Sequence, residues 1–262
     1  AELPLAGETF DLVLASTPFY ATSGGQVADA GVLTSNDLLW RVVDVRREAG
    51  QVVHAAVLLQ HPSELATWED LRAIQEEVPS VRWAAPQLRA TASVLSEDQN
   101  WTTSVYGTTP DLFLIRTWPA ARGSLFSQSD VDAGTKVAVL GQTVVDKIFG
   151  PNADPVGQVV RIKNVPFTVI GVLSKKGQSQ FGQALDDTVF VPTSTYLQKI
   201  QGGLGNYIAG IIAVSATSAE ATSRAESQIR ALLRDRHRLQ SGTDDDFSIR
   251  NLAELANASQ EG

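Results

Sequence analysis

The first sixty residues carry short runs in which apolar side chains recur at every second position. Phe10, Leu12 and Leu14 form the first run, and two longer β-rich runs cover residues 39–45 and 51–59. A period of two is typical of strands that bury one face. Three such runs, separated by turns, predict a small β-meander or barrel.

Helical signals then appear between the strands. Thr67 followed by Asp70 has the spacing of a capping box, and Pro79 stops the helix that begins there. A strand is expected over residues 85–95. Together with the strand before it, this helix predicts one strand–helix–strand unit over residues 51–95.

The middle of the chain predicts a smaller mixed segment. A short helix is expected over residues 143–149, and strands are expected over residues 137–140, 158–163, 166–173 and 188–192. These short elements predict a small α/β insert.

The last block returns to a strand, a helix and a strand. A strand is expected over residues 207–214, and Thr217 with Glu220 has the spacing of a second capping box. An apolar stripe at every fourth position marks the helix that follows, and a closing strand is expected over residues 247–250. Two βαβ-like units are therefore expected to flank the insert.

The composition narrows the classes of function. The formal net charge is −8, and the 21 Lys and Arg residues are scattered. Non-specific nucleic-acid binding and docking on anionic lipids both need clustered cations, so neither is expected. The absence of Cys excludes disulfides, thiolate metal sites and thiol nucleophiles. No apolar stretch approaches the roughly 18 to 20 residues that cross a bilayer, and no signal peptide opens the chain.

The chain also contains no Met, not even an initiator. This favours a segment of a longer protein, and a coincidence of composition is the alternative.

An ordered succession of short motifs runs through most of the chain. The motifs are rich in Gly, Pro and apolar residues, and they are Val105–Pro110, Gly123–Phe126, Val137–Gly141, Phe149-Gly150, Asp154–Gln158, Val169–Leu173, Lys176–Gln178, Asp186-Asp187, Val189–Pro192, Leu232–Arg234, Arg236-His237 and Asp245–Phe247. No single motif is specific, but their order resembles the periplasmic core of MacB-type ABC transporter permeases over about residues 60–262.

The resemblance implies a fold and boundaries. The expected fold class is α+β, with two βαβ-like porter-type units flanking a small α/β insert and a short β-barrel-like segment before them. The expected domains are a β-rich segment over residues 1–57, a porter-like domain over residues 58–128 and 204–262, and an inserted subdomain over residues 129–203.

The resemblance also implies a function. The chain is expected to be the periplasmic part of an inner-membrane protein, without catalytic residues, that transmits ATP-driven motion for efflux or export. Its expected partners are a periplasmic membrane-fusion adaptor, an outer-membrane duct reached indirectly, and a permease partner subunit, with no nucleic acid. ATP hydrolysis would reside in a nucleotide-binding domain outside this chain, and the isolated segment is expected to be monomeric.

A second resemblance covers the first block. Thr17–Ala21 (TPFYA) and Ser23–Val27 (SGGQV) are similar to the β-barrel segment of alanyl-tRNA synthetase. A fusion is therefore expected, with its junction between Val57 and Trp68 and with residues 54–60 supplying the first strand of the transporter fold. The alternative function is a fragment of an alanine–tRNA ligase that lacks its catalytic and editing sites, since the paired His ligands of the editing site do not occur here.

A polar, Gly-containing loop is the favoured surface for a partner. The residues assigned to partner contact are Lys175, Lys176, Gly177, Gln178, Asp186 and Asp187. A hairpin loop without any contact is the alternative. A catalytic pair at Asp186 and Asp187 is disfavoured, because adjacent residues on a strand point to opposite faces.

No catalytic, metal or cofactor site is expected. His237 lies in an Arg-rich helix end, where compensation of the helix dipole is favoured over catalysis, and His54 and His61 are the other two histidines. The acidic run over residues 244–246 lacks the alternating ligands of a calcium loop, so a solvated turn is favoured. Neither a nucleophile elbow nor a P-loop occurs in the sequence.

Aromatic residues give two further expectations. The five tryptophans fall on different expected elements, so core or interface packing is favoured over a stacking platform. Phe113, Ile115 and Trp118 are expected to form an exposed apolar patch.

Overall fold

The structure is a computed structural model, and it separates the chain into two compact units, Ala1–Leu65 and Ala66–Gly262. The residues that it describes are 9–13, 31–35, 38–48, 51–60, 66–177 and 184–251.

The first unit contains a four-stranded antiparallel sheet in the order β1-β4-β3-β2. Its strands are β1 (Thr9–Val13), β2 (Gly31–Ser35), β3 (Leu38–Glu48) and β4 (Gln51–Gln60). The side chains of Val45 and Val53 are buried in this unit. The strands expected in this block are confirmed, and closure into a barrel stays a prediction.

The strand over residues 51–60 does not serve the role predicted for it. β4 pairs with β1 and β3, and His54 lies opposite Leu12 and Val45. The expectation that residues 54–60 supply the first strand of the transporter fold is therefore wrong, because the edges of β4 are taken up within the first unit. For the same reason the strand–helix–strand unit predicted over residues 51–95 does not form.

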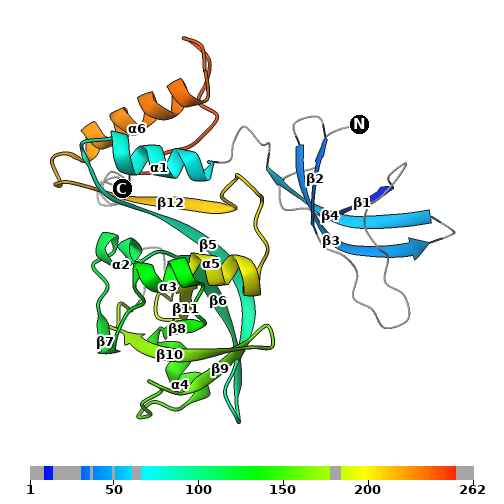
Figure 1. The fold of residues 1–262 in the computed structure, drawn as a ribbon, viewed down its shortest axis with the longest axis vertical. Coiled ribbons are helices and arrows are strands. Elements are labelled where there is room, and N and C mark those ends of the chain that lie inside the picture. The colour runs from blue at the N-terminus through cyan, green and yellow to red at the C-terminus, as the bar shows by residue number, and fades with distance from the viewer. Residues whose placement is uncertain are drawn as a thin grey trace, which may run out of the picture. The chain divides into compact units, whose positions relative to one another are not determined.

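The second unit is built on one mixed eight-stranded sheet (Figure 1). Its order is β12-β5-β6-β11-β8-β10-β7, with β9 paired to both β10 and β5. The strands are β5 (Val81–Leu95), β6 (Asn100–Thr108), β7 (Ala120–Gly123), β8 (Val137–Leu140), β9 (Val159–Ile162), β10 (Val165–Leu173), β11 (Thr188–Pro192) and β12 (Gly210–Ala216).

Helices cover both faces of this sheet. α1 and α6 lie side by side next to β12 and the start of β5 (Figure 1). The helices are α1 (Trp68–Glu77), α2 (Asp111–Ile115), α3 (Gln128–Ala133), α4 (Gln142–Ile148), α5 (Thr193–Thr195), which continues into a π-helical turn over Tyr196–Ile200, and α6 (Thr222–Arg236).

The helix caps test the sequence patterns directly. The capping box at Thr67 and Asp70 is present, since each backbone N–H donates to the other residue's side chain at 3.0 Å. The prediction of a second capping box, at Thr217 and Glu220, is wrong. α6 begins only at Thr222, and the hydroxyl of Ser218 accepts from the backbone N–H of Ala221 at 3.1 Å.

The strand expected over residues 247–250 is also absent from the described part of the chain. Phe247 and Ile249 instead pack against the core, while Ser248 and Arg250 are exposed. They have the alternation of a strand without a hydrogen-bonded ladder, which explains why the pattern predicted one.

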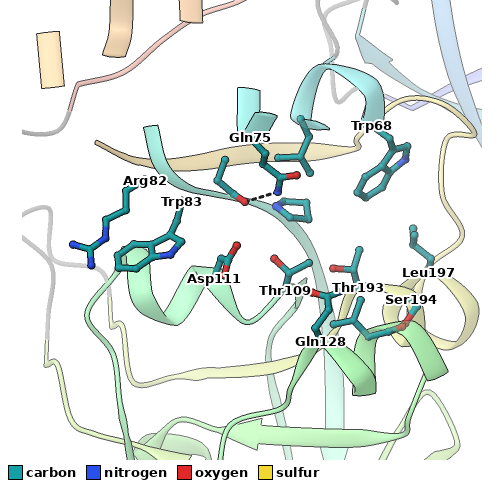
Figure 2. A pocket seen from close by; sticks show the side chains of 14 residues that line it. Trp68, Gln75, Arg82, Trp83, Thr109, Asp111, Gln128, Thr193, Ser194 and Leu197 are labelled. Atoms are coloured by element: carbon teal, nitrogen blue, oxygen red, sulfur yellow. Dashed lines mark hydrogen bonds between the residues drawn. The ribbon is translucent and has the colours of Figure 1, made fainter. Parts of the chain in front are cut away.

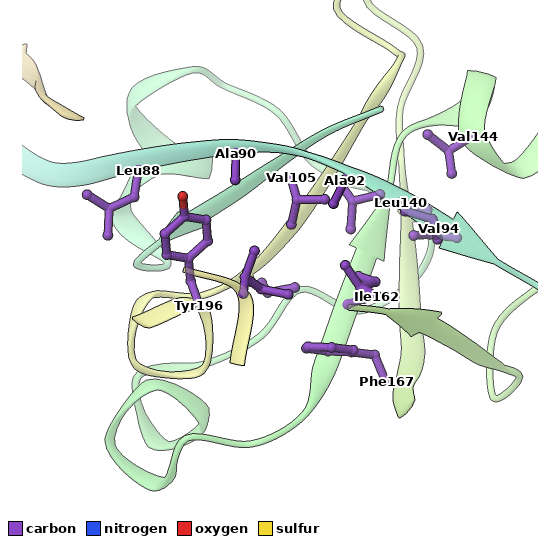
Figure 3. Packing of buried hydrophobic residues seen from close by; sticks show 14 of the residues in the cluster. Leu88, Ala90, Ala92, Val94, Val105, Leu140, Val144, Ile162, Phe167 and Tyr196 are labelled. Carbon is purple, nitrogen blue, oxygen red and sulfur yellow. The ribbon is translucent and has the colours of Figure 1, made fainter. Parts of the chain in front are cut away.

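Two hydrophobic clusters fill the two faces of the sheet. In β8, Ala138 and Leu140 belong to the cluster under α1, α4 and α6, whereas Val137 and Val139 belong to the cluster under α2. Figure 3 shows the first cluster along β5, where Leu88, Ala90, Ala92 and Val94 point to the same side.

The second cluster corrects the predicted apolar patch. Phe113 and Trp118 are 3% and 2% exposed, and both rings pack edge-to-face against Phe190. The indole N–H of Trp118 donates to the carbonyl of Ser174 at 2.7 Å. The aromatic residues of this stretch are therefore core, and Leu114 is the large apolar side chain between them that is exposed.

A glycine on β6 gives a test of the packing. A Cβ on Gly107 would lie 2.5 Å from both Cβ and Cγ of Tyr196. We expect Gly107→Ala to lower the free energy of unfolding by about 1–3 kcal/mol, because the ring is locked in the core. Gly202→Ala is the control, since no atom lies within 4 Å of its Cβ position. Denaturant unfolding of both variants measures the difference, and equal effects would contradict this packing.

The two separate sheets give a second test. The sheet of the second unit takes no strand from the described residues of the first unit. We therefore expect a fragment of residues 66–262 to fold alone and to melt in one cooperative transition, as followed by circular dichroism. A fragment that is unfolded at room temperature would show that residues 1–65 contribute to its core.

Candidate functional site

The loop assigned to partner contact leaves the sheet after β10 and returns at β11. Lys175, Lys176 and Gly177 are exposed, and Gln178 lies outside the described residues. The carboxylate of Asp186 accepts from the backbone N–H of Lys176 and of Gly177, both at 2.8 Å. Asp186 therefore fixes the base of the loop, and its carboxylate is occupied by backbone.

Lys176 is held back toward the body of the domain. Its ammonium group donates to the carbonyl of Arg116 at 2.5 Å and lies 5.2 Å from the centre of the Trp118 ring. Partial burial and the nearby Arg116 lower the pKa of Lys176. Lys175 thus remains as the cation of this loop for which the described structure shows no side-chain partner.

Asp187 points the other way, toward β6. Its carboxylate accepts from the indole N–H of Trp101 at 2.9 Å and from the hydroxyl of Thr103 at 2.7 Å. The structure therefore brings Lys175, Lys176 and Gly177 together with Asp186 and Asp187 at one loop base, but it gives the two acids different partners. Asp187 anchors the loop to the sheet.

A groove of about 740 Å³ lies between α1 and β5 on one side and α2, α3 and α5 on the other (Figure 2). Trp68 and Trp83 stand at its two ends. The guanidinium of Arg82 lies 4.1 Å from the centre of the Trp83 ring, and the amide of Gln75 donates to the carbonyl of Ala84 at 2.8 Å. Besides Arg82, the polar lining consists of hydroxyls, amides and one carboxylate, from Gln75, Thr109, Asp111, Gln128, Thr193 and Ser194.

The sequence did not reveal this groove. Trp68 starts α1 and Trp83 lies at the start of β5, fifteen positions apart, so only the antiparallel return of the chain places both beside one groove. Burial raises the pKa of Asp111 in this lining.

A network of charged side chains joins α1, α6 and the segment after α6. Asp70, whose side chain is 2% exposed, accepts from the guanidinium of Arg236 at 2.8 Å and contacts the ring of His237 at 2.8 Å. The other ring nitrogen of His237 contacts Asp246, also at 2.8 Å. Burial raises the pKa of Asp70, but its contacts with Arg236, Thr67 and His237 lower it further than burial raises it.

The acidic run over residues 244–246 is therefore more than a solvated turn. Asp245 pairs with Arg230 at 3.1 Å and with Arg234 at 2.6 Å, and Asp246 contacts His237. Asp244 is exposed. The run binds the cations at the end of α6, which a sequence without spatial information could not indicate.

No group of three or more His, Cys, Asp or Glu residues in the described ranges could hold a metal ion. None of the helices within those ranges is long and apolar enough to cross a membrane.

These features define a class of protein before any relative is considered: an α+β domain with an anchored polar loop and an open groove, suited to contact with other molecules. More particularly, the chain belongs to the MacB-like periplasmic core domain family, whose family model matches residues 21–232.

Relatives in sequence are export proteins. The chain is 34% identical over 242 residues to the macrolide export ATP-binding/permease protein MacB of Syntrophobacter fumaroxidans, covering 72% of this chain and 33% of that protein. It is 32% identical over 199 residues to the pyoverdine export ATP-binding/permease protein PvdT of Pseudomonas entomophila, covering 76% of this chain and 29% of that protein. The chain thus spans no more than about a third of the length of these relatives.

Solved structures share the fold. The periplasmic region of MacB from Actinobacillus actinomycetemcomitans matches with a TM-score of 0.63 and 23% identity, over 78% of this chain and 87% of that chain. The extracellular domain of the ABC-type transporter YknZ from Gram-positive bacteria matches with a TM-score of 0.57 and 19% identity, over 72% of this chain and 91% of that chain. The α+β fold expected from the sequence is confirmed at this level.

The anchor of the loop can be tested by mutation. Asp187→Ala leaves two donors, Trp101 and the buried Thr103, without their acceptor. We expect a loss of about 1–3 kcal/mol in the free energy of unfolding. Asp98→Ala, in an exposed turn, is the control. If both variants unfold at the same denaturant concentration, Asp187 is not an anchor.

Proposed function

We propose that this chain is the extracytoplasmic core of a MacB-like ABC transporter permease, which relays ATP-driven motion and docks a periplasmic adaptor for export. The single observation that carries the proposal is the match of the family model over residues 21–232. The relatives that resemble this stretch are named for export of a macrolide or of pyoverdine.

A continuous sheet supports the relay of motion. β5 and β6 belong to the proposed porter-like part over residues 58–128 and 204–262, and β11 belongs to the proposed insert over residues 129–203. β11 pairs in parallel with β6 from Thr188 to Pro192. Backbone hydrogen bonds across this boundary favour joint movement of the porter-like part and the insert, in contrast to a flexible linker.

The exposed loop base supports a docking role. Lys175, Lys176 and Gly177 are exposed, and the hydrogen bonds of Asp186 and Asp187 fix the base of the loop. A loop on a rigid support loses little conformational entropy on binding, which is a common arrangement for recognition. We assign the adaptor contact to this loop, with Gln178 included.

The remaining parts of the proposal concern the whole permease. The membrane helices, the nucleotide-binding domain that hydrolyses ATP, the partner subunit and the outer-membrane duct would all lie outside this chain, which would occupy the periplasmic side of the inner membrane. No catalytic role is proposed for the chain itself.

The alternative of an alanine–tRNA ligase fragment gains no support from the relatives described above. The family model begins at residue 21 and so extends over most of the segment that resembles the synthetase.

A binding experiment tests the docking proposal. The purified soluble part of a membrane-fusion adaptor from a MacB-type exporter is immobilised, and binding of the full chain is followed by interferometry. We expect Lys175→Glu to weaken binding by about three- to tenfold, because a charge at the rim of an interface acts mainly on the association rate. The control is Arg72→Glu, which reverses an exposed positive charge on α1, away from the loop, and should bind normally.

Three outcomes are informative. Equal binding by both variants would exclude the loop as the contact. Absence of adaptor binding would contradict the docking proposal. Binding of tRNA that falls steeply as salt is raised would instead support the ligase alternative.

A further inference from the structure

A buried carboxylate lies where α1 meets the end of α6. Asp70 is the third residue of α1, and its side chain is 2% exposed. It has three partners: the backbone N–H of Thr67 at 3.0 Å, Nε of Arg236 at 2.8 Å and Nε2 of His237 at 2.8 Å. A buried charge is stable only with such partners, so Asp70 is expected to stay ionised.

His237 stands between two carboxylates. Its Nε2 faces Asp70 and its Nδ1 faces Oδ1 of Asp246, each at 2.8 Å. An ionised carboxylate only accepts hydrogen bonds, and a neutral imidazole has one N–H. Both contacts can therefore be hydrogen bonds only when the ring is a cation. With both carboxylates ionised, the geometry is that of a protonated His237.

The charges around the ring agree with this state. Burial lowers the pKa of His237, but the contacts with Asp246 and Asp70 raise it by more, so the net pKa lies above the ordinary value. Each neighbouring cation is paired with an acid: Arg236 with Asp70, and Arg230 and Arg234 with Asp245. Arg230 also pairs with Glu226, and the ring of Phe247 meets the imidazole edge-on at 6.0 Å.

We propose that His237 is a proton-operated latch that fastens the segment over residues 239–251 to the junction of α1 and α6. Protonated, the ring bridges Asp70 and Asp246. Neutral, it can satisfy only one of them. The side chain of Asp70 is 2% exposed and that of Asp246 is 17% exposed, so water can replace the ring at Asp246 but not at Asp70. The contact that is released is therefore the one with Asp246.

The direction of the pH effect follows from the raised pKa. The latch contributes its full stability below the ordinary pKa of His, about 6.5, and loses it as the pH rises through the raised pKa. Asp70 acts oppositely, since its pKa is lowered: its contribution is present above the ordinary pKa of Asp and is lost as the pH falls through the lowered value. The latch is therefore tightest in mildly acidic solution. The latch is a property of this chain alone, so it does not depend on the proposed transport role or on docking of an adaptor.

NMR of the imidazole groups in the full chain tests the latch. We expect His237 to titrate above about 6.5 and to carry hydrogen on both ring nitrogens below its midpoint. Asp246→Asn should lower that midpoint by about 0.5 to 1 pH unit. Asp244→Asn removes the same charge two residues away, on an exposed side chain, and should leave the midpoint unchanged.

Hydrogen exchange provides the structural readout. We expect amides in residues 239–251 to lose protection above the midpoint of His237, beyond the intrinsic pH dependence of exchange. In His237→Gln, which cannot titrate, that step should disappear.

Three results would overturn the latch. They are titration of His237 at or below about 6.5, equal effects of Asp246→Asn and Asp244→Asn, and protection that is independent of the charge on the ring. The two aspartate variants keep the test decisive even where His237→Gln folds poorly.

Discussion

The long strand β5 is the constraint on which the second unit depends. Its first half pairs with β12, its second half pairs with β6, and its last two residues pair with β9. One strand thus joins the helix pair α1 and α6 to the sheet region around α4 (Figure 1). Because its inward side chains alternate strictly over Leu88–Val94, a shift of one residue would expose the whole row, so the register is firmly set.

The polar interactions differ greatly in how much they contribute to the stability of the fold. The pair Arg72–Glu76 has both side chains more than 60% exposed, and such pairs contribute little to stability. Asp70 is buried, so the loss of both Arg236 and His237 would leave an uncompensated charge in the interior. The network around Asp70 therefore decides how α1, α6 and the chain after α6 stay together, although it involves few residues.

The two adjacent acids at the base of the loop after β10 have different structural roles. Asp186 closes the loop base through backbone N–H groups, and Asp187 ties it to β6. Neither carboxylate is free for chemistry, which agrees with a surface that binds and does not catalyse. The groove beside α1 offers a second surface, with two tryptophans, hydroxyl and amide groups, and the charged side chains of Arg82 and Asp111.

The sequence by itself determined the local elements and the family. Short apolar runs located β8, β10 and β11 within one residue, and the capping box at Thr67 and Asp70 located the start of α1. These signals depend on neighbours a few positions away. The order of the Gly- and Pro-rich motifs indicated the family that the family model then matched.

Only the tertiary structure decided which strands pair and which side chains meet. β4 carries the pattern of a strand for either sheet, and its pairing with β1 and β3 was settled by the competition for its edges. Asp70 and His237 are 167 positions apart, and Trp68 and Trp83 fall on different elements. Local patterns report burial and periodicity, whereas contacts across the sheet depend on the path of the whole chain.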